Sequence, residues 1–173
     1  MQTPPSTDTV TPNLALERIV ERFDGLVSKA AWGETALFYN PGHILKHGTY
    51  FATIKTKDGD NDRASNIDRC DVWRLNFTLP KDVFSERFGA PPARPAKGCA
   101  VQGPWDFTAL DIILPHPVYG WMSWVAVLSP SPTTFSTCLD LMSISFEKIR
   151  QKHARKLAQH RTCPTLSSSF MSP

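Results

Sequence analysis

An almost uninterrupted apolar stretch, PHPVYGWMSWVAVL at residues 115–128, constrains the fold more than any other part of the chain. Side chains alternate between the two faces of a strand, and here both faces would be largely apolar. Strands of this kind lie in sheets that are covered on both sides. We therefore predict a central strand that is buried on both faces.

His116 stands at the mouth of this predicted strand, between Pro115 and Pro117. The two prolines fix φ and lack a backbone N–H, so the direction of the imidazole is largely preset. One interpretation is a ligand pocket, in which a rigid imidazole lies beside large aromatic side chains. The other is a structural corner that only turns the chain into the core. The residues leave both interpretations open.

Hydrophobic periodicity and turn signals predict the order helix, three strands, two helices, strand, helix, which segregates helices and strands. The expected helices are residues 12–23, 80–88, 106–114 and 133–159. The expected strands are residues 31–39, 50–56, 72–79 and 115–128. This order favours an α+β fold with an antiparallel sheet of about four strands and helices packed mainly on one face.

Composition favours a single globular domain. The chain has 173 residues, of which 41% are hydrophobic, and a net charge of +3. We expect one α+β domain at residues 12–160 between disordered tails at 1–11 and 161–173. The N-terminal segment lacks the basic start and apolar core of a signal peptide, and no apolar run is long enough to cross a bilayer. We therefore expect a soluble, cytoplasmic protein without membrane contact.

Metal sites are not expected. The four cysteines have neither the CxxC spacing nor the paired histidines of a zinc site. The loop DGDNDRASNIDRCD at residues 58–71 begins like a calcium loop, but Arg63 takes the place of the glycine and Arg69 that of the final glutamate. A solvated loop held by its own Asp and Asn side chains is the alternative. We predict no metal and no cofactor.

The candidate site is a small-molecule pocket near His116. Asp111 precedes the histidine on a predicted helix and is a candidate to orient its imidazole. The loop at residues 58–71 is also a candidate part of the site, because long loops are often functional. A His–Asp pair with a cation nearby is sufficient for general acid–base chemistry. The proposed catalytic residues are His116, Asp68 and Asp111. The proposed substrate-binding residues are Lys55, Arg63, Arg69, Trp73, Tyr119, Trp121 and Trp124.

Two function classes follow from these residues. The first is a small-molecule-binding protein, with cofactor-free isomerase, cyclase or lyase chemistry if it is catalytic. The second is a nucleic-acid- or protein-binding module that uses the basic end of the last predicted helix, where Lys148, Lys152, Arg155 and Lys156 share a face. Because the net charge is mild, we expect a small-molecule partner rather than nucleic acid. The sequence leaves the oligomeric state open.

Five segments together resemble an uncharacterised family catalogued as domain of unknown function 6194. They are WGETALFYNPG (32–42), YFATIKTKDGDNDRASNIDR (50–69), VWRLNFTL (72–79), FGAPPARPAKG (88–98) and DFTALDIILPHPVYGWMSWV (106–125). The resemblance covers roughly residues 14 to 155 and implies no established activity. The order of elements is also similar to that of the YjbR/MmcQ-like α+β proteins, which implies a YjbR-like layout. Members of that group are often labelled DNA-binding, a property that would require a basic face on the sheet.

Overall fold

The structure is a computed structural model that describes residues 9–31 and 33–162. Of the tails predicted at 1–11 and 161–173, residues 1–8 and 163–173 lie outside the described residues, whereas residues 161–162 belong to the last helix. The helices are α1 (Pro12–Arg22), α2 (Lys81–Phe88) and α3 (Pro132–Thr162), with short 3-10 helices η1 (Pro41–His43) and η2 (Gly120–Met122). The strands are β1 (Leu26–Ala31), β2 (Glu34–Tyr39), β3 (Thr49–Lys55), β4 (Arg74–Thr78), β5 (Leu114–Pro115) and β6 (Trp124–Leu128).

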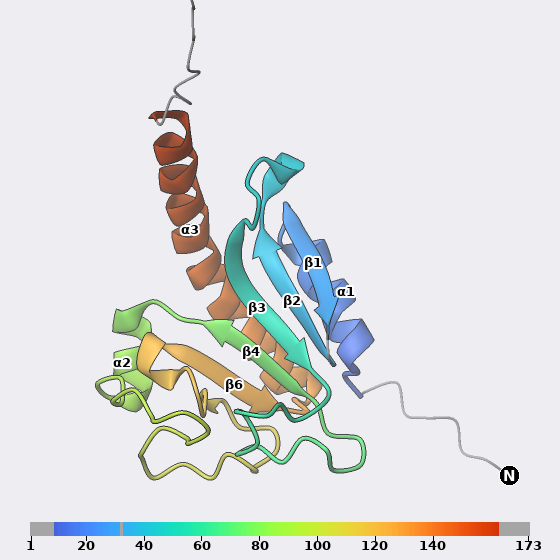
Figure 1. The fold of residues 1–173 in the computed structure, drawn as a ribbon. Helices are drawn as coiled ribbons and strands as arrows, with labels where there is room; N and C mark the ends of the chain where they lie inside the picture. Colours follow the sequence, from blue (N-terminus) through green and yellow to red (C-terminus); the bar gives the residue numbers. More distant parts are fainter. Residues whose placement is uncertain (1–8, 32, 163–173) are drawn as a thin grey trace, which may run out of the picture.

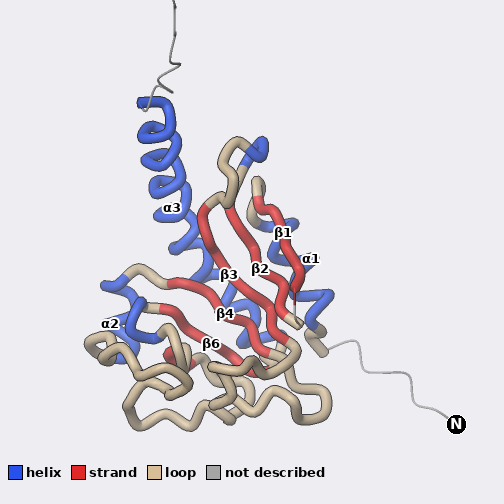
Figure 2. The backbone as a smooth tube through the Cα atoms, viewed as in Figure 1, coloured by secondary structure: helices blue, strands red, loops and turns tan. Residues whose placement is uncertain are grey.

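The strands form one antiparallel sheet in the order β1-β2-β3-β4-β6-β5. Helices α1 and α3 lie behind the sheet as it is viewed in Figure 1, and α3 continues beyond the end of the sheet. The long loops at residues 56–73 and 89–113 gather along its lower edge (Figure 2). The predicted α+β class and antiparallel sheet are confirmed, but the sheet has six strands rather than about four.

Local signals explain where α1 begins. The Thr11 hydroxyl caps it by accepting a hydrogen bond from the N–H of Leu14 at 3.2 Å, and Pro12 occupies the first turn. Ile19 and Phe23 are buried, as the helical spacing predicts, whereas Val20 is exposed. Val10 belongs to the core as well, although it falls within the predicted tail.

The core lies between the helices and one face of the sheet. From α3 it takes Phe135, Met142 and Ile149, which recur at helical spacing on one face. From β4 it takes Leu75 and Phe77, which alternate with polar residues. The strand predicted at 72–79 thus has one face in the core, and the alternation directs the intervening polar side chains to the opposite face.

The prediction of one continuous strand at 115–128 is wrong. The stretch is a hairpin-like unit in which β5 pairs with β6, and the N–H of His116 donates to the carbonyl of Trp124 at 2.8 Å. Between them the chain turns through η2 to Ser123, whose φ of 63° lies in the left-handed region. β6 lies between β4 and β5 rather than at the centre of the sheet, although residues 125–128 are buried.

The helix predicted at 106–114 is absent, and the segment forms turns instead. The carboxylate of Asp106 accepts hydrogen bonds from the backbone N–H of Thr108 at 2.9 Å and from its hydroxyl at 2.7 Å. Such a local bond offers the backbone a turn as an alternative to a helix. Asp111 has φ at 60°, which a right-handed helix cannot contain.

Candidate functional site

A pocket of about 520 Å³ lies on the sheet face that the core does not use. Its walls come from β2, β3, β4 and β6, from the loop after β3, from the segment 116–122 and from the distal part of α3. Among its lining residues are Glu34, Tyr50, Thr53, Lys55, Asp62, Arg74, Asn76, His116, Tyr119, Met122, Trp124 and Lys152. Its size is in the range of small-molecule sites.

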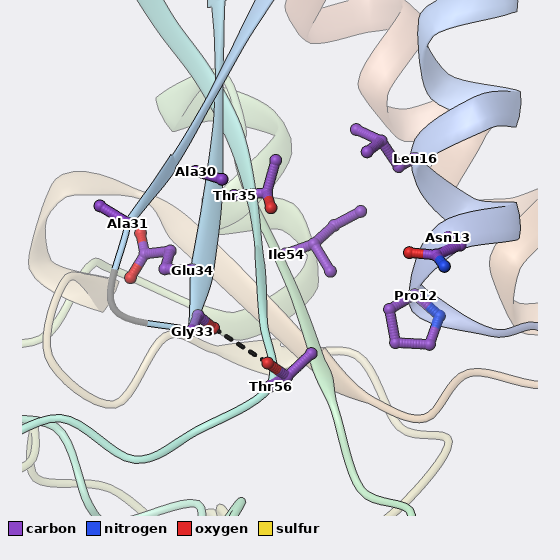
Figure 3. Close-up of a pocket in the computed structure, with 10 residues that line it drawn as sticks. All are labelled: Pro12, Asn13, Leu16, Ala30, Ala31, Gly33, Glu34, Thr35, Ile54 and Thr56. Carbon is purple, nitrogen blue, oxygen red and sulfur yellow. Dashed lines mark hydrogen bonds between the residues drawn. The ribbon is translucent and has the colours of Figure 1, made fainter.

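A second cavity of about 410 Å³ lies between the start of α1 and the ends of β1, β2 and β3 (Figure 3). Pro12, Leu16, Ala30 and Ile54 are among its lining residues, and the hydroxyl of Thr56 donates to the carbonyl of Gly33 at 3.2 Å. Glu34 is its one ionisable lining residue among those described. The pocket of about 520 Å³ therefore offers more ionisable side chains to a ligand than this cavity does.

Strand register brings the polar residues of the first pocket together. Arg74 and Asn76 are two residues apart on β4, and their partners across the ladder are Lys55 and Thr53 on β3. Positions two apart on a strand share a face, so these four side chains form one polar patch. Leu75 and Ile54, the residues between them, face the core.

A bulge in β3 adds Tyr50 to this face. Leu37 pairs with Ala52 and Phe38 pairs with Tyr50, so Phe51 is an extra residue in β3. Phe51 and Ala52 are both buried, while Tyr50 and Thr53 line the pocket. Without the extra residue the alternation would direct Tyr50 and Thr53 to opposite faces. The bulge therefore places an aromatic ring at the mouth of the polar patch.

The floor of the pocket is a buried ion cluster. The Arg74 guanidinium, 1% exposed, contacts both carboxylate oxygens of Asp62, and its Nη1 donates to the Ser65 hydroxyl at 2.8 Å. Lys55 Nζ lies 3.1 Å from Asp62 Oδ2 and 3.8 Å from Glu34 Oε2. Two cations thus share the half-buried Asp62 carboxylate, while the more exposed Glu34 lies nearer the solvent.

These contacts set the protonation state of Asp62. Burial disfavours its charged form, but the hydrogen bonds and charge of Arg74, with Lys55, outweigh burial and hold its pKa well below the usual range. Asp62 is therefore an ionised partner of Arg74 and Lys55 at neutral pH. Its lowered pKa also makes the carboxylate a weak base.

His116 is buried beside this cluster. Its Nδ1 accepts hydrogen bonds from the backbone N–H groups of Val118 at 3.0 Å and Tyr119 at 3.1 Å, and its Nε2 lies 3.2 Å from Arg74 Nη2. Burial, then the charge of Arg74, lowers its pKa well below the usual value, against the opposing effect of Asp62. The imidazole is therefore neutral at pH 7 and caps the turn at 116–119.

Asn76 and Arg74 also carry buried polar atoms that have no hydrogen-bond partner among the described residues. They are Asn76 Oδ1, an acceptor, and Arg74 Nε, a donor. The amide nitrogen of Asn76 donates to the Thr53 hydroxyl at 2.8 Å. Leaving such groups unpaired costs about 1–3 kcal/mol each. The floor of the pocket thus has unused hydrogen-bonding capacity of both kinds.

Aromatic and apolar side chains form the walls. The rings of Tyr50 and Trp124 lie 5.3 Å apart, and Tyr119 and Met122 are both about half exposed. The Tyr50 hydroxyl donates to Glu34 Oε1 at 3.3 Å. Burial, then the charge of Glu34, raises the pKa of Tyr50, so it remains a phenol at neutral pH. The pocket joins an aromatic wall to an ionic floor.

Four of the residues proposed from the sequence line this pocket: His116, Lys55, Tyr119 and Trp124. Their roles remain predictions. Trp73 does not join them, because its side chain is buried in the core on the other face of the sheet. Trp121 is not among the lining residues and packs under the Arg94 guanidinium, 5.0 Å from ring centroid to Cζ.

Charged residues proposed from the loops have structural contacts elsewhere. Asp68 accepts from the backbone N–H of Asp58 at 3.0 Å, and Arg69 donates to three backbone carbonyls, including that of Thr108 at 2.9 Å. Arg63 is exposed and lies 3.6 Å from Asp60. Asp111 accepts from the backbone N–H of Ser131 at 2.6 Å rather than orienting His116.

Sequence reasoning missed the centre of the site, which is Arg74, Asp62 and Asn76. Arg74 and Asn76 stand at alternating positions of a predicted strand, and such a pattern usually marks a solvated face. Thr53 and Lys55 repeat the pattern on the adjacent strand. Two neighbouring strands with polar residues at matched spacing were the available signal. The contact with Asp62, from a loop, has no sequence signature.

No group of three or more His, Cys, Asp or Glu side chains within residues 9–31 and 33–162 is arranged to hold a metal ion. In the loop that begins like a calcium site, Asp58 accepts from the backbone N–H of Ile67 at 3.0 Å and Asp62 binds Arg74. Of the cysteines, Cys70, Cys99 and Cys138 are free thiols, and Cys163 lies outside the described residues. Among the described helices, none could span a membrane.

Comparison with known proteins places the chain in a family. Residues 11–158 match the family described as a family of unknown function, DUF6194, so the chain belongs to it. This confirms the first resemblance seen in the sequence. Neither a curated protein nor a solved structure gave a match.

Proposed function

Because membership of a family of unknown function assigns no activity, we propose from the site alone that the protein binds a small polar molecule in the pocket over β3, β4 and β6. The observation that carries this proposal is the buried cluster of Arg74, Lys55 and Asp62 beneath an open pocket. Burying such charges costs several kcal/mol per ion, and apolar residues often serve stability equally well. Perturbed ionisable groups in a concave site are typical of functional sites.

The chemistry of the cluster favours binding over turnover. Asp62 is a weak base because Arg74 and Lys55 stabilise its charge. His116 has a backbone contact on Nδ1 and the Arg74 contact on Nε2, so neither nitrogen is open to a ligand in this arrangement. A general base needs a free atom within hydrogen-bond reach of the proton that it removes. Cofactor-free acid–base catalysis is therefore the less supported form of the proposal.

The alternative, nucleic-acid or protein binding by the basic end of α3, has weaker support. Arg74 is buried and cannot extend that basic end into a flat surface. Lys148 lies 3.3 Å from Asp82, Arg150 lies 3.5 Å from Glu147, and Lys156 donates to the carbonyl of Gly48 at 2.9 Å. A YjbR-like layout also remains a proposal, and it is supported by the order of elements, which is a helix, an antiparallel sheet and a closing helix. A cytoplasmic location likewise remains a proposal.

A thermal-shift screen with a metabolite library tests small-molecule binding, because a ligand specific for the native state raises the melting temperature. Hits are then measured by calorimetry on Trp124→Ala, which removes part of the aromatic wall. Trp105→Ala is the matched control, since Trp105 is also half-buried but packs near Phe107 outside the pocket. We expect binding to be lost in the first variant and kept in the second. Equal binding by both variants, or no hit, would contradict the proposal.

A further inference from the structure

We infer that the ligand is a small carboxylic acid with an aromatic body, an inference that rests on the proposed binding function. It follows from two features of the pocket that lie side by side. One is the excess of positive charge at the floor, and the other is the aromatic wall. Each feature selects one end of the ligand.

The charge at the floor selects an anion. Arg74 and Lys55 are both buried and share the Asp62 carboxylate, with Glu34 at the longer distance of 3.8 Å and 34% exposed. Lys152 at the rim adds a third cation. The lining therefore carries three positive and two negative side chains. An added carboxylate would balance this charge in a site that is partly shielded from water.

Lys55 is the group that would bind this carboxylate. The Nη groups of Arg74 already donate to Asp62 and Ser65, whereas an ammonium has three donors. Lys55 uses one donor on Asp62 at 3.1 Å, and Glu34 is beyond hydrogen-bond distance. Its side chain is 10% exposed, so a charge-assisted bond there would be partly desolvated.

The wall selects an aromatic body. Tyr50 and Trp124 lie with ring centroids 5.3 Å apart, and Tyr119 and Met122 present exposed apolar surface at the mouth. Offset and edge-on ring contacts add to apolar burial, and thioethers pack well on rings. A flat ring on this wall would leave its carboxylate directed to the floor.

Calorimetry with four related probes tests the inference on the wild-type protein. The probes are phenylacetate, its neutral amide phenylacetamide, the cation 2-phenylethylamine and the non-aromatic cyclohexylacetate. We expect phenylacetate to bind roughly tenfold more tightly than the amide. A hydrogen bond to a charged group contributes about 1.5 kcal/mol or more, and about 1.4 kcal/mol corresponds to a tenfold change in affinity. We expect cyclohexylacetate to bind more weakly than phenylacetate, and the amine to bind weakest of all.

Lys55→Met should remove the preference for phenylacetate over phenylacetamide. Lys57→Met is the matched control, because Lys57 is exposed, two residues along the chain and outside the pocket, and it should keep the preference. Equal affinity for the acid and the amide, preference for the amine, or no binding of any probe would overturn the inference. A library hit without carboxylate would then leave the proposed pocket standing, whereas the absence of any hit would contradict both.

Discussion

Arg74 is a buried guanidinium whose partners come from a loop nine to twelve residues earlier in the chain. Arg74→Ala would leave Asp62 with Lys55 alone and Ser65 without its donor. We expect the free energy of unfolding to fall by about 3–5 kcal/mol, as when one partner of a buried ion pair is removed. Urea denaturation would measure the loss.

Arg150→Ala is the control for this change. Arg150 lies 3.5 Å from Glu147 on the same helix, and both side chains are mostly exposed. Exposed pairs contribute little, so the unfolding midpoint should hardly move. Similar losses in the two variants would mean that Arg74, Asp62 and Lys55 do not form a buried network beneath the pocket.

Trp124 shows how well the burial of a side chain can be predicted from its neighbours in the sequence. Its place in an apolar stretch predicts a core residue, for which truncation would cost about 3–5 kcal/mol. The side chain is instead half-buried on the pocket face, against Tyr50. We now expect Trp124→Ala to cost clearly less than Phe77→Ala, since Phe77 is fully buried on the same sheet. Paired denaturation curves would show this, and equal losses would place Trp124 in the core after all.

At the scale of elements, the sequence predicts segments whose signals are local. Thr11 and Pro12 mark the start of α1, and alternation identifies β4. The strand β1 escaped prediction because its pattern, LVSKAA, has an exposed polar middle and no alternation. The bulge at Phe51 and the turn at His116 depend on the exact register in which consecutive strands pair, and the local pattern does not give that register. The pocket depends on both, so only part of it could be predicted.

The order of the strands in the sheet predicts that their backbone amides are unequally protected against hydrogen exchange. β1 is an edge strand with exposed residues in its middle, whereas β4 lies between β3 and β6 with four of its five residues buried. Local opening is easiest where few apolar contacts are lost. We expect hydrogen-bonded amides of β1 to exchange at least tenfold faster than those of β4. Native-state hydrogen exchange by NMR measures this, and equal protection would argue against the assigned order.

At the scale of the whole molecule, protonation of the buried histidines links stability to pH. The pKa of His116 is lowered by burial and then by Arg74, and that of His153 is lowered by burial and then by Lys156. Below a pH of about 6.5 the unfolded chain binds protons that the folded chain does not. The free energy of unfolding should therefore be highest above that pH and should fall as the pH decreases toward the folded pKa values. Asp62, whose pKa is also lowered, should add a further loss below a pH of about 4.

The variant His116→Asn isolates one part of this dependence. An asparagine oxygen can accept from the N–H groups of Val118 and Tyr119 as Nδ1 does, so the turn should persist. Between pH 7 and 5 we expect the variant to lose the His116 contribution, which is at most about 1.4 kcal/mol per pH unit. His47→Asn is the control, because His47 is exposed, and it should retain the wild-type slope. Urea midpoints measured across this range provide the comparison. If His116→Asn keeps the full wild-type dependence of the free energy of unfolding on pH, the imidazole is not held neutral beside Arg74. The net charge of the pocket lining would then differ from the one that favours an anionic ligand.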